Sequence, residues 1–179
     1  MSPSEGRAPF AYFQRLSPEG KRIYEKSDSI LGIALPEPER LRPLVARMGE
    51  ALSAGDKPAL ERAATDLARG LTDALGAPPV EVRIDSVRPS SRSSELHGLY
   101  TLEEGKAPRI RLWMKTARRR RVVAFRTFLR TLLHEVCHHL DYTHFRLADS
   151  FHTAGFFRRE SSLFQSLVPP TGDPPGSEP

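Results

Sequence analysis

The most regular pattern of hydrophobic positions lies in the C-terminal half of the chain, over residues 122–140. Apolar side chains recur there at steps of three and four residues, at Val122, Phe125, Leu129, Leu132, Val136 and Leu140. This spacing gathers them on one stripe of an amphipathic α-helix that lies against a core. A second segment of the same period starts near residue 152 and predicts another helix, with apolar positions at Phe156, Leu163, Phe164 and Leu167.

The N-terminal half predicts three more helices. Ser17 before Pro18 is typical of an N-cap followed by proline at the first helical position, so a short helix is expected over residues 18–26. Amphipathic helices are expected over residues 39–52 and 57–75, where we expect a scaffold without chemistry. The short first helix lies in a stretch rich in aromatic residues. We expect this stretch to pack on the main domain, and docking on a partner is the alternative.

Between these groups of helices the hydrophobic period falls to two, which is typical of strands. Strands are predicted over residues 80–87, 96–102 and 109–114, with Gly98 as a bulge or a close approach of the backbone. Because few turn residues separate them, we expect an antiparallel meander with the second strand, which includes His97, in the middle. A histidine there is more typical of a structural or exposed side chain than of a ligand. The prediction is an α+β fold with a small, mainly antiparallel sheet of about three strands.

The chain length of 179 residues allows one domain with a sizeable core and is too short for two ordinary ones. We predict an N-terminal segment over residues 1–35, the main domain over 36–168 and a disordered, Pro-rich tail over 169–179. The sequence shows neither a signal-like apolar stretch near its start nor a run of membrane-spanning length, so a cytoplasmic protein without membrane contact is expected. Its one cysteine, Cys137, excludes an internal disulfide and is expected to be a small buried packing residue.

The candidate chemistry lies inside the predicted helix over residues 122–140, where His134, Glu135 and His138 form a His-Glu-x-x-His motif. A spacing of four residues places both imidazoles on one face of a helix, from which they can reach one metal ion. Glu135 is placed to accept a proton from a water at the open coordination position. A polar helix edge that binds no metal is the alternative, and the helical setting favours the metal site.

A catalytic zinc ion generally has three protein ligands, so the chain must supply one more. His152 is the preferred candidate, because the fourteen residues that separate it from His138 leave room for a loop to turn back. Glu160 is the alternative, either as the ligand itself or as a carboxylate that orients a ligand. Asp141 follows His138 by three residues and is expected to orient a ligand imidazole or to cap the turn.

Positive charge is concentrated directly before the motif helix, at Arg118, Arg119, Arg120 and Arg121. Lys and Arg outnumber Asp and Glu by 27 to 22 over the whole chain, which favours anionic partners such as nucleic acid. Each cation near a helix N-terminus opposes the helix dipole by roughly 0.3–1 kcal/mol, so helix stability does not explain the cluster. Phosphate binding is one interpretation, and a solvated turn is the other.

The motif His134-Glu135-x-x-His138, followed by His152 with a phenylalanine four positions later, resembles the SprT-like zincin peptidases. Two helices, a small sheet and then the motif helix are also the order of elements in that family. The resemblance covers about residues 40–168 and implies a zincin-like fold, Zn²⁺ held by the three histidines and Glu135 as general base. The chain departs from the better-known members in having Thr-Ala-Gly after His152 where they tend to have Gly-Pro-Glu, and in lacking a Cys-rich zinc ribbon after the domain.

These features predict a zinc-dependent metallopeptidase that hydrolyses protein or peptide substrates. Some SprT-like proteins degrade proteins crosslinked to DNA, so the resemblance also implies DNA-associated proteins as candidate substrates. One alternative is a non-catalytic zincin-fold module that binds DNA or regulates, and another is a purely structural metal. Tyr142, His144 and Tyr100 are candidates for stabilising an oxyanion, and spacing supports none of them over the others.

Overall fold

The computed structural model describes residues 9–87, 97–115 and 121–169. Within these ranges the chain forms five α-helices, two short 3-10 helices and one three-stranded sheet. The elements follow the order η1 (Ala11–Arg15), α1 (Pro18–Ser29), η2 (Pro38–Arg40), α2 (Arg42–Ala54), α3 (Lys57–Ala74), β1 (Glu81–Val87), β2 (Gly98–Thr101), β3 (Arg109–Lys115), α4 (Phe125–Thr143) and α5 (Ala154–Leu167). The protein is therefore a mixed α+β structure, as the sequence predicts.

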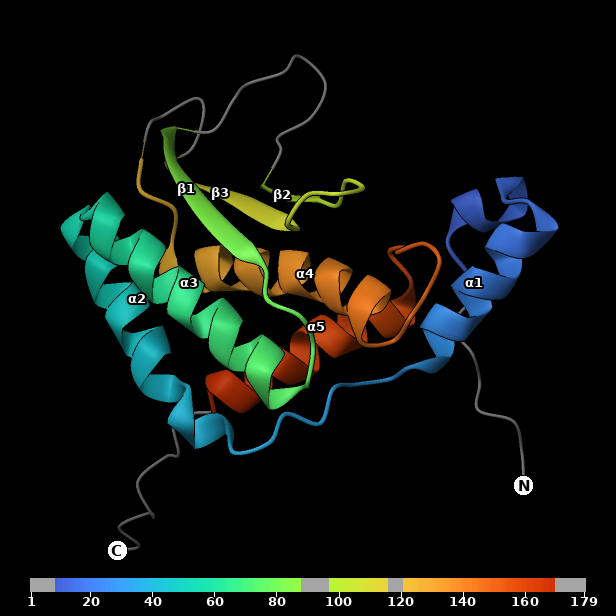
Figure 1. Ribbon diagram of the computed structural model, residues 1–179, viewed down its shortest axis with the longest axis horizontal. Helices are drawn as coiled ribbons and strands as arrows, with labels where there is room; N and C mark the ends of the chain where they lie inside the picture. The colour runs from blue at the N-terminus through green and yellow to red at the C-terminus, as the bar shows by residue number, and fades with distance from the viewer. Residues whose placement is uncertain (1–8, 88–96, 116–120, 170–179) are drawn as a thin grey trace, which may run out of the picture.

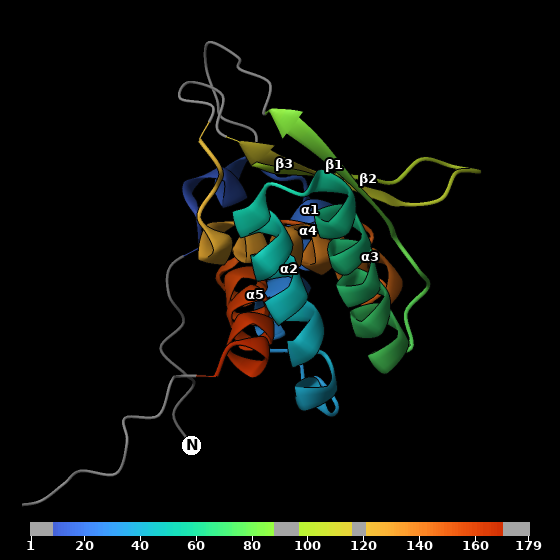
Figure 2. The same ribbon diagram turned by 90° about the vertical axis from the view of Figure 1, so that its left-hand side faces the viewer.

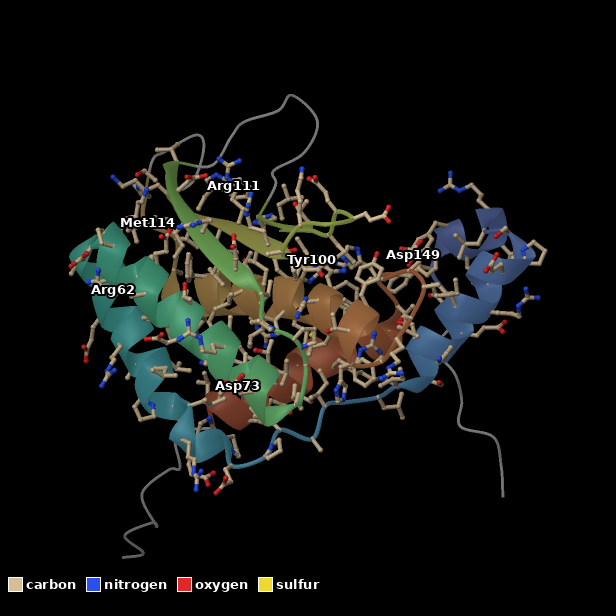
Figure 3. All side chains as sticks on the ribbon, in the orientation of Figure 1. Arg62, Asp73, Tyr100, Arg111, Met114 and Asp149 are labelled. Atoms are coloured by element: carbon tan, nitrogen blue, oxygen red, sulfur yellow. The ribbon has the colours of Figure 1, made fainter. Side chains whose placement is uncertain are left out.

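The sheet lies on one side of the helices, and α4 runs directly beneath it (Figure 1). In the view turned by 90°, α2, α3, α4 and α5 all lie on the same side of the sheet (Figure 2). Arg111 projects from the opposite face of the sheet, whereas Tyr100 lies between β2 and α4 (Figure 3). Arg111 and Asp85 form an ion pair on that outer face, between neighbouring strands. The core thus lies between the sheet and the helices, with α4 at its centre.

The strand order differs from the predicted meander. It is β1-β3-β2, with β1 parallel to β3 and β2 antiparallel to β3, so the sheet is mixed and β3, not β2, lies in the middle. The short connection between β2 and β3 makes the expected hairpin. The connection from β1 to β2 is longer, and β2 does not pair with β1 but with the other edge of β3. The central strand is the one with the most buried apolar side chains, which are Ile110, Leu112, Trp113 and Met114.

Most of the predicted helices form where the hydrophobic period places them. Ser17 caps α1 by accepting a hydrogen bond from the Gly20 amide at 3.1 Å, as the sequence predicts. The motif helix, however, begins at Phe125 and excludes Val122, which is 43% exposed and pairs with Lys115 in an isolated β-bridge. The second predicted helix likewise begins later, at α2, because residues 38–40 form the separate turn η2.

The N-terminal segment packs against α5 at the end of the molecule nearest the loop between α4 and α5 (Figure 1). Four of its aromatic contacts join Tyr12, Phe13, Tyr24 and Phe151 in one cluster. Ile33 and Leu35 are buried in the main core. None of the helices in the described parts of the chain is both long and apolar enough to cross a membrane. The predicted tail lies almost entirely outside the described residues.

Candidate metal centre

Helix α4 presents the two motif histidines on a flank beside its buried stripe. Leu132, Leu133 and Val136 are fully buried in the core, whereas His134 and His138 are only partly buried and face a cleft. Their rings are 5.0 Å apart between centroids, as expected for two residues one turn apart on a helix. The local period of α4 therefore determines that both imidazoles point into the same space.

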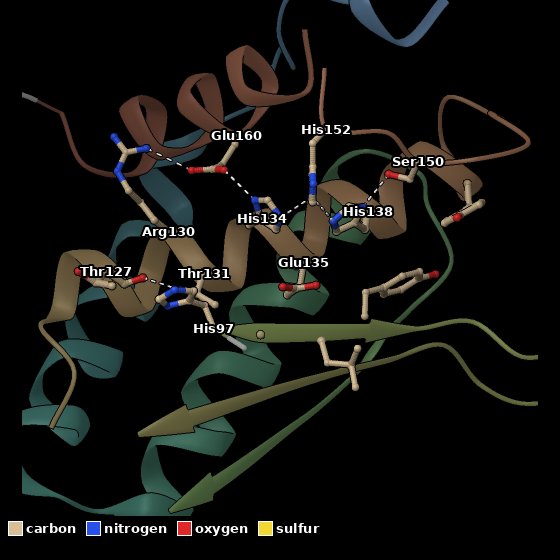
Figure 4. A pocket seen from close by; sticks show the side chains of 14 residues that line it. His97, Thr127, Arg130, Thr131, His134, Glu135, His138, Ser150, His152 and Glu160 are labelled. Carbon is tan, nitrogen blue, oxygen red and sulfur yellow. Dashed lines mark hydrogen bonds and ion pairs between the residues drawn. The ribbon is translucent and has the colours of Figure 1, made fainter. Parts of the chain in front are cut away.

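His152 reaches the same space from the loop that precedes α5. Its Nε2 atom lies 2.9 Å from Nε2 of His134 and 3.0 Å from Nε2 of His138. Figure 4 shows His152 pointing between the other two imidazoles, with Glu135 on the side of α4 that faces β2. These three histidines offer ligand atoms that all lie within 4.8 Å of one another. The structure thus brings together the three residues that the sequence singled out, although they come from two elements.

The other ring nitrogens of two of these histidines are held by acceptors. Nδ1 of His134 lies 3.1 Å from the Glu160 carboxylate, and Nδ1 of His138 lies 2.7 Å from the hydroxyl of Ser150. An ionised carboxylate can only accept, so the proton of the neutral His134 ring lies on Nδ1. In both rings Nε2 is then the nitrogen with a free lone pair. Partners of this kind around ligand imidazoles fix the tautomer and the orientation that a metal requires.

The donor set fits a divalent ion such as zinc. In a tetrahedral site with zinc–nitrogen distances of about 2.0–2.1 Å, the nitrogens are about 3.3 Å apart, so the two contacts of His152 Nε2, at 2.9 Å and 3.0 Å, need to open by only a few tenths of an ångström. Burial, together with the neighbouring histidines, lowers the pKa of His138 to about 3, and burial also lowers the pKa of His152. Neutral imidazoles are the forms that bind metal. Three nitrogens leave a fourth coordination position open.

Glu135 lines the same cleft from the side of α4 that faces strand β2, and its side chain is almost entirely buried. Burial raises the pKa of Glu135 to about 7, although His134 and the backbone amide of Tyr100 oppose this rise. A Cβ atom at Gly98 would come within 2.6 Å of the Glu135 carboxylate. The close backbone approach predicted at Gly98 is therefore confirmed, and its cause is the space that Glu135 needs.

These side chains line one open cleft of about 640 Å³ between α4, β2 and the start of α5. The cleft runs past the histidines toward the N-terminal half of α4, and the residues that line it are His97, Gly98, Leu99, Tyr100, Thr127, Arg130, Thr131, His134, Glu135, His138, Tyr142, Ser150, His152 and Glu160. His97 is exposed and lies just before β2, not within the middle strand as predicted.

Asp141 and Glu160 lie one layer outside the histidine cluster. Glu160 contacts Nδ1 of His134, the nitrogen that points away from the cluster, and also pairs with Arg130 at 3.3 Å. Asp141 reaches His138 indirectly, because it accepts a hydrogen bond from Ser150 at 2.7 Å. Both carboxylates are therefore placed to orient ligand rings, which is one of the two roles that the sequence left open for them.

Two of the three candidates for oxyanion stabilisation lie in the cleft. Tyr100 and Tyr142 line the cleft, whereas His144 is not among the described residues that do so. Each tyrosine hydroxyl already has a partner, His139 Nδ1 at 3.1 Å for Tyr100 and the Asp149 carboxylate at 3.2 Å for Tyr142. Neither hydroxyl is free for the role without a rearrangement.

The basic cluster before α4 is only partly visible. Arg118, Arg119 and Arg120 lie outside the described residues, and Arg121 is exposed two residues before the buried Val123. Cys137 is fully buried, as predicted, and burial raises the pKa of its thiol well above the ordinary value. It is a packing residue on the core side of α4.

Sequence reasoning missed two residues that hold the site, Ser150 and Arg159. Ser150 lies in a polar loop, where nothing in the local pattern distinguishes it. Arg159 had a usable signal, because it lies three residues after Phe156 and four before Leu163, on the apolar stripe of its helix. A charged residue in such a position is buried only when it is paired.

Comparisons with protein-family models, with curated proteins and with solved structures find no match for this chain.

Proposed function

We propose that the protein is a zinc-dependent metallopeptidase of the SprT-like zincin type, with His134, His138 and His152 as ligands and Glu135 as general base. The observation that carries this proposal is the convergence of three Nε2 atoms, two of them 2.9 Å and 3.0 Å from the third, beside a buried carboxylate in an open cleft. Metal binding alone would not require a carboxylate at position 135. The mixed α+β fold and the order of its elements are compatible with a zincin.

The chemistry follows from the placement of the chain's own groups. When bound, the ion would act as a Lewis acid that polarises the scissile carbonyl and makes a water molecule more acidic. Glu135 lines the same cleft as the three histidines and would take the proton of the attacking water and deliver it to the leaving amine. Glu160 and Ser150 hold the imidazoles of His134 and His138 in place through Nδ1. Because the Glu135 side chain is buried, its attraction to the positive charge of a bound ion would be stronger than in water.

Strand β2 supports a peptide as the substrate. Among the described strands it pairs only with β3, so its other edge is not covered by a further strand. The strand that follows His97 runs alongside α4 (Figure 4), and its residues Gly98, Leu99 and Tyr100 line the cleft. An extended peptide can add to such an edge through main-chain hydrogen bonds. The scissile bond of a peptide bound in this way would pass between the edge of the sheet and the histidines.

The ligand assignment is tested by metal content. Wild type, His152→Ala and Glu160→Ala are dialysed against the same metal-free buffer after zinc loading, and zinc is measured by elemental mass spectrometry. The proposal expects close to one zinc per chain in wild type, loss in His152→Ala and retention, with weaker binding, in Glu160→Ala. Retention in His152→Ala with loss in Glu160→Ala would assign the third ligand to the glutamate. Wild type that binds no zinc would refute the proposal.

Catalysis is tested separately with Glu135→Gln. This variant is expected to keep its zinc and to lose cleavage of a peptide library monitored by mass spectrometry, while wild type cleaves. Equal cleavage in both proteins would exclude Glu135 as the base. If the two proteins bind zinc equally and neither cleaves, a non-catalytic module becomes the better hypothesis. That alternative predicts a salt-dependent affinity for DNA that falls when Arg118, Arg119, Arg120 and Arg121 are neutralised.

A further inference from the structure

The N-terminal segment meets the rest of the protein beside the proposed third ligand. The C-terminal end of α1 lies against the first turn of α5, where Asp28 accepts a hydrogen bond from the Gly155 amide at 2.7 Å. A Cβ atom at Gly155 would lie only 2.5–2.7 Å from the carbonyl oxygens of Asp28 and Ser27, so the two backbones are in direct contact. The hydroxyls of Ser27 and Thr153 are 3.4 Å apart. Residues from opposite ends of the chain thus hold the segment that carries His152.

Arg159 connects the same end of α1 to α4. Its guanidinium donates to the carbonyls of Ser27 at 2.6 Å and Ile30 at 3.0 Å, and to the Ser27 hydroxyl at 2.9 Å. It also donates to both carboxylate oxygens of Asp141, at 2.9 and 3.2 Å. Arg159, Asp141 and Ser27 are all completely buried. The position of the Asp141 carboxylate therefore depends on where α1 holds Arg159.

The connection continues from Asp141 to a metal ligand. Ser150 donates its single hydroxyl proton to Asp141 at 2.7 Å, so the same oxygen must accept from Nδ1 of His138, also at 2.7 Å. This direction leaves the proton of the neutral His138 ring on Nδ1 and the lone pair on Nε2, where the histidines converge. A continuous series of hydrogen bonds therefore runs from the carbonyls of α1 to His138.

A second connection reaches His152 itself. The hydroxyl of Tyr12, in η1, donates to the backbone carbonyl of His152 at 2.9 Å across 140 positions of sequence. The Tyr12 ring also contacts Phe151, the residue before the ligand.

We infer that the N-terminal segment, residues 10–33, is a positioning element of the metal centre, which it holds through Arg159, Asp141 and Ser150 at His138 and through Tyr12 at His152. The inference rests on the proposed metal site. It explains why an aromatic segment outside the scaffold helices is packed so closely on the domain. Tyr12 and Ser27 are positioning residues, because they reach the ligands only through hydrogen bonds to other groups and are not ligands themselves.

The test uses full-length protein and two probes, Zn²⁺ and Co²⁺. Tyr12→Phe and Ser27→Ala each remove one hydroxyl from the connections, and the Kd for zinc is measured by competition with a chelator. We expect each Kd to rise about tenfold, as is typical when an outer group around a metal ligand is lost. At saturating Co²⁺ both variants should show an altered visible absorption spectrum, because the ligand geometry itself has changed.

Two controls separate positioning from general loss of stability. Tyr24→Phe removes a hydroxyl from the same aromatic cluster, but one that contacts the Phe10 amide and not the ligand loop. Leu60→Ala destabilises the buried core at α3, a helix that contributes no residue to the metal site. Both should keep the wild-type zinc Kd and cobalt spectrum. Wild-type values in Tyr12→Phe and Ser27→Ala would overturn the inference, as would equal changes in the controls. Wild type that binds no metal would instead refute the proposed function.

Discussion

Arg159 is the buried group whose replacement should affect the fold most. Its side chain and that of Asp141 are both 0% exposed, and their closest atoms are 2.9 Å apart. In Arg159→Met the apolar stem is kept and the charge is lost. The substitution leaves the Asp141 carboxylate buried without its counter-ion, and it removes one hydrogen-bond donor from each of the carbonyls of Ser27 and Ile30. The loss of folding free energy therefore comes mainly from the buried partners that are left unpaired, and less from the hydrogen bonds themselves.

Breaking a buried ion pair by removing one partner costs about 3–5 kcal/mol in the free energy of unfolding. In a chain of this length each kcal/mol lowers Tm by about 2–4 °C, so a decrease of roughly 6–20 °C is expected. Unfolding by urea, followed by circular dichroism, measures the difference. A chelator is kept in all samples, because metal binding to the folded state would add its own stabilisation.

Arg158→Met is the matched control, because it is the same substitution at the neighbouring, exposed position. It should change the free energy of unfolding by no more than about 0.5 kcal/mol. In the double variant Arg159→Met with Asp141→Asn, the unpaired charge is gone, so the loss should be smaller than the sum of the two single losses. A loss below about 1 kcal/mol in Arg159→Met would refute the reasoning, since a fully buried and paired charge cannot be removed so cheaply.

The same variant should depend on pH in a defined direction. Burial raises the pKa of Asp141 already in the wild type, although Arg159 and Ser150 oppose the rise. Without the guanidinium the folded-state pKa rises further above the unfolded value of about 3.9, so the folded variant binds a proton that the unfolded chain does not. Its deficit relative to wild type should therefore shrink as the pH falls from about 7 toward 5. A deficit that grows on acidification would contradict a buried, unpaired carboxylate.

Three further predictions can be checked with the same protein. In Gly98→Ala the new methyl group would lie 2.6 Å from the Glu135 carboxylate and should displace it. Peptide cleavage should fall by about a hundredfold with little change in zinc content. Gly32→Ala is the control, because its nearest neighbour lies at 3.6 Å, and it should cleave like wild type. Cys137 should not react with a thiol reagent in the folded protein and should react fully in denaturant, because it is 0% exposed. Added zinc should raise the Tm of wild type but not of His152→Ala, and removal of metal should leave the far-ultraviolet circular dichroism unchanged, since the core is apolar and does not include the histidines.

The helices and the face that each one buries follow from local sequence. In α4, a period of three and four residues predicts the buried stripe, and a spacing of four places His134 and His138 on one flank. Both statements depend only on helix geometry, so no distant residue can alter them much. The close approach at Gly98 was also predictable, because a glycine within a strand pattern indicates that something lies against the backbone.

The order of the strands was not predictable in the same way. Each strand shows which face it buries, but the pattern within a strand does not say which neighbour it pairs with. The turn between β2 and β3 is short and forces a hairpin, whereas the longer connection after β1 permits either side. The strand that lies in the middle, β3, is the one with the most buried apolar side chains, and the central position covers both of its edges.

The sequence by itself determined the chemical types at the site and the relative placement of three of its residues, His134, Glu135 and His138, because these lie on one helix. The tertiary structure decided which further residues belong to the site. It brought His152 within 3.0 Å of the motif histidines, placed Glu160 outside the cluster, and linked Ser150 and Arg159 to the site. Such contacts join residues far apart in the chain, and their geometry depends on how α1, α4 and α5 pack together. Periodicity carries no information on that packing, since it records only which side of each helix is buried.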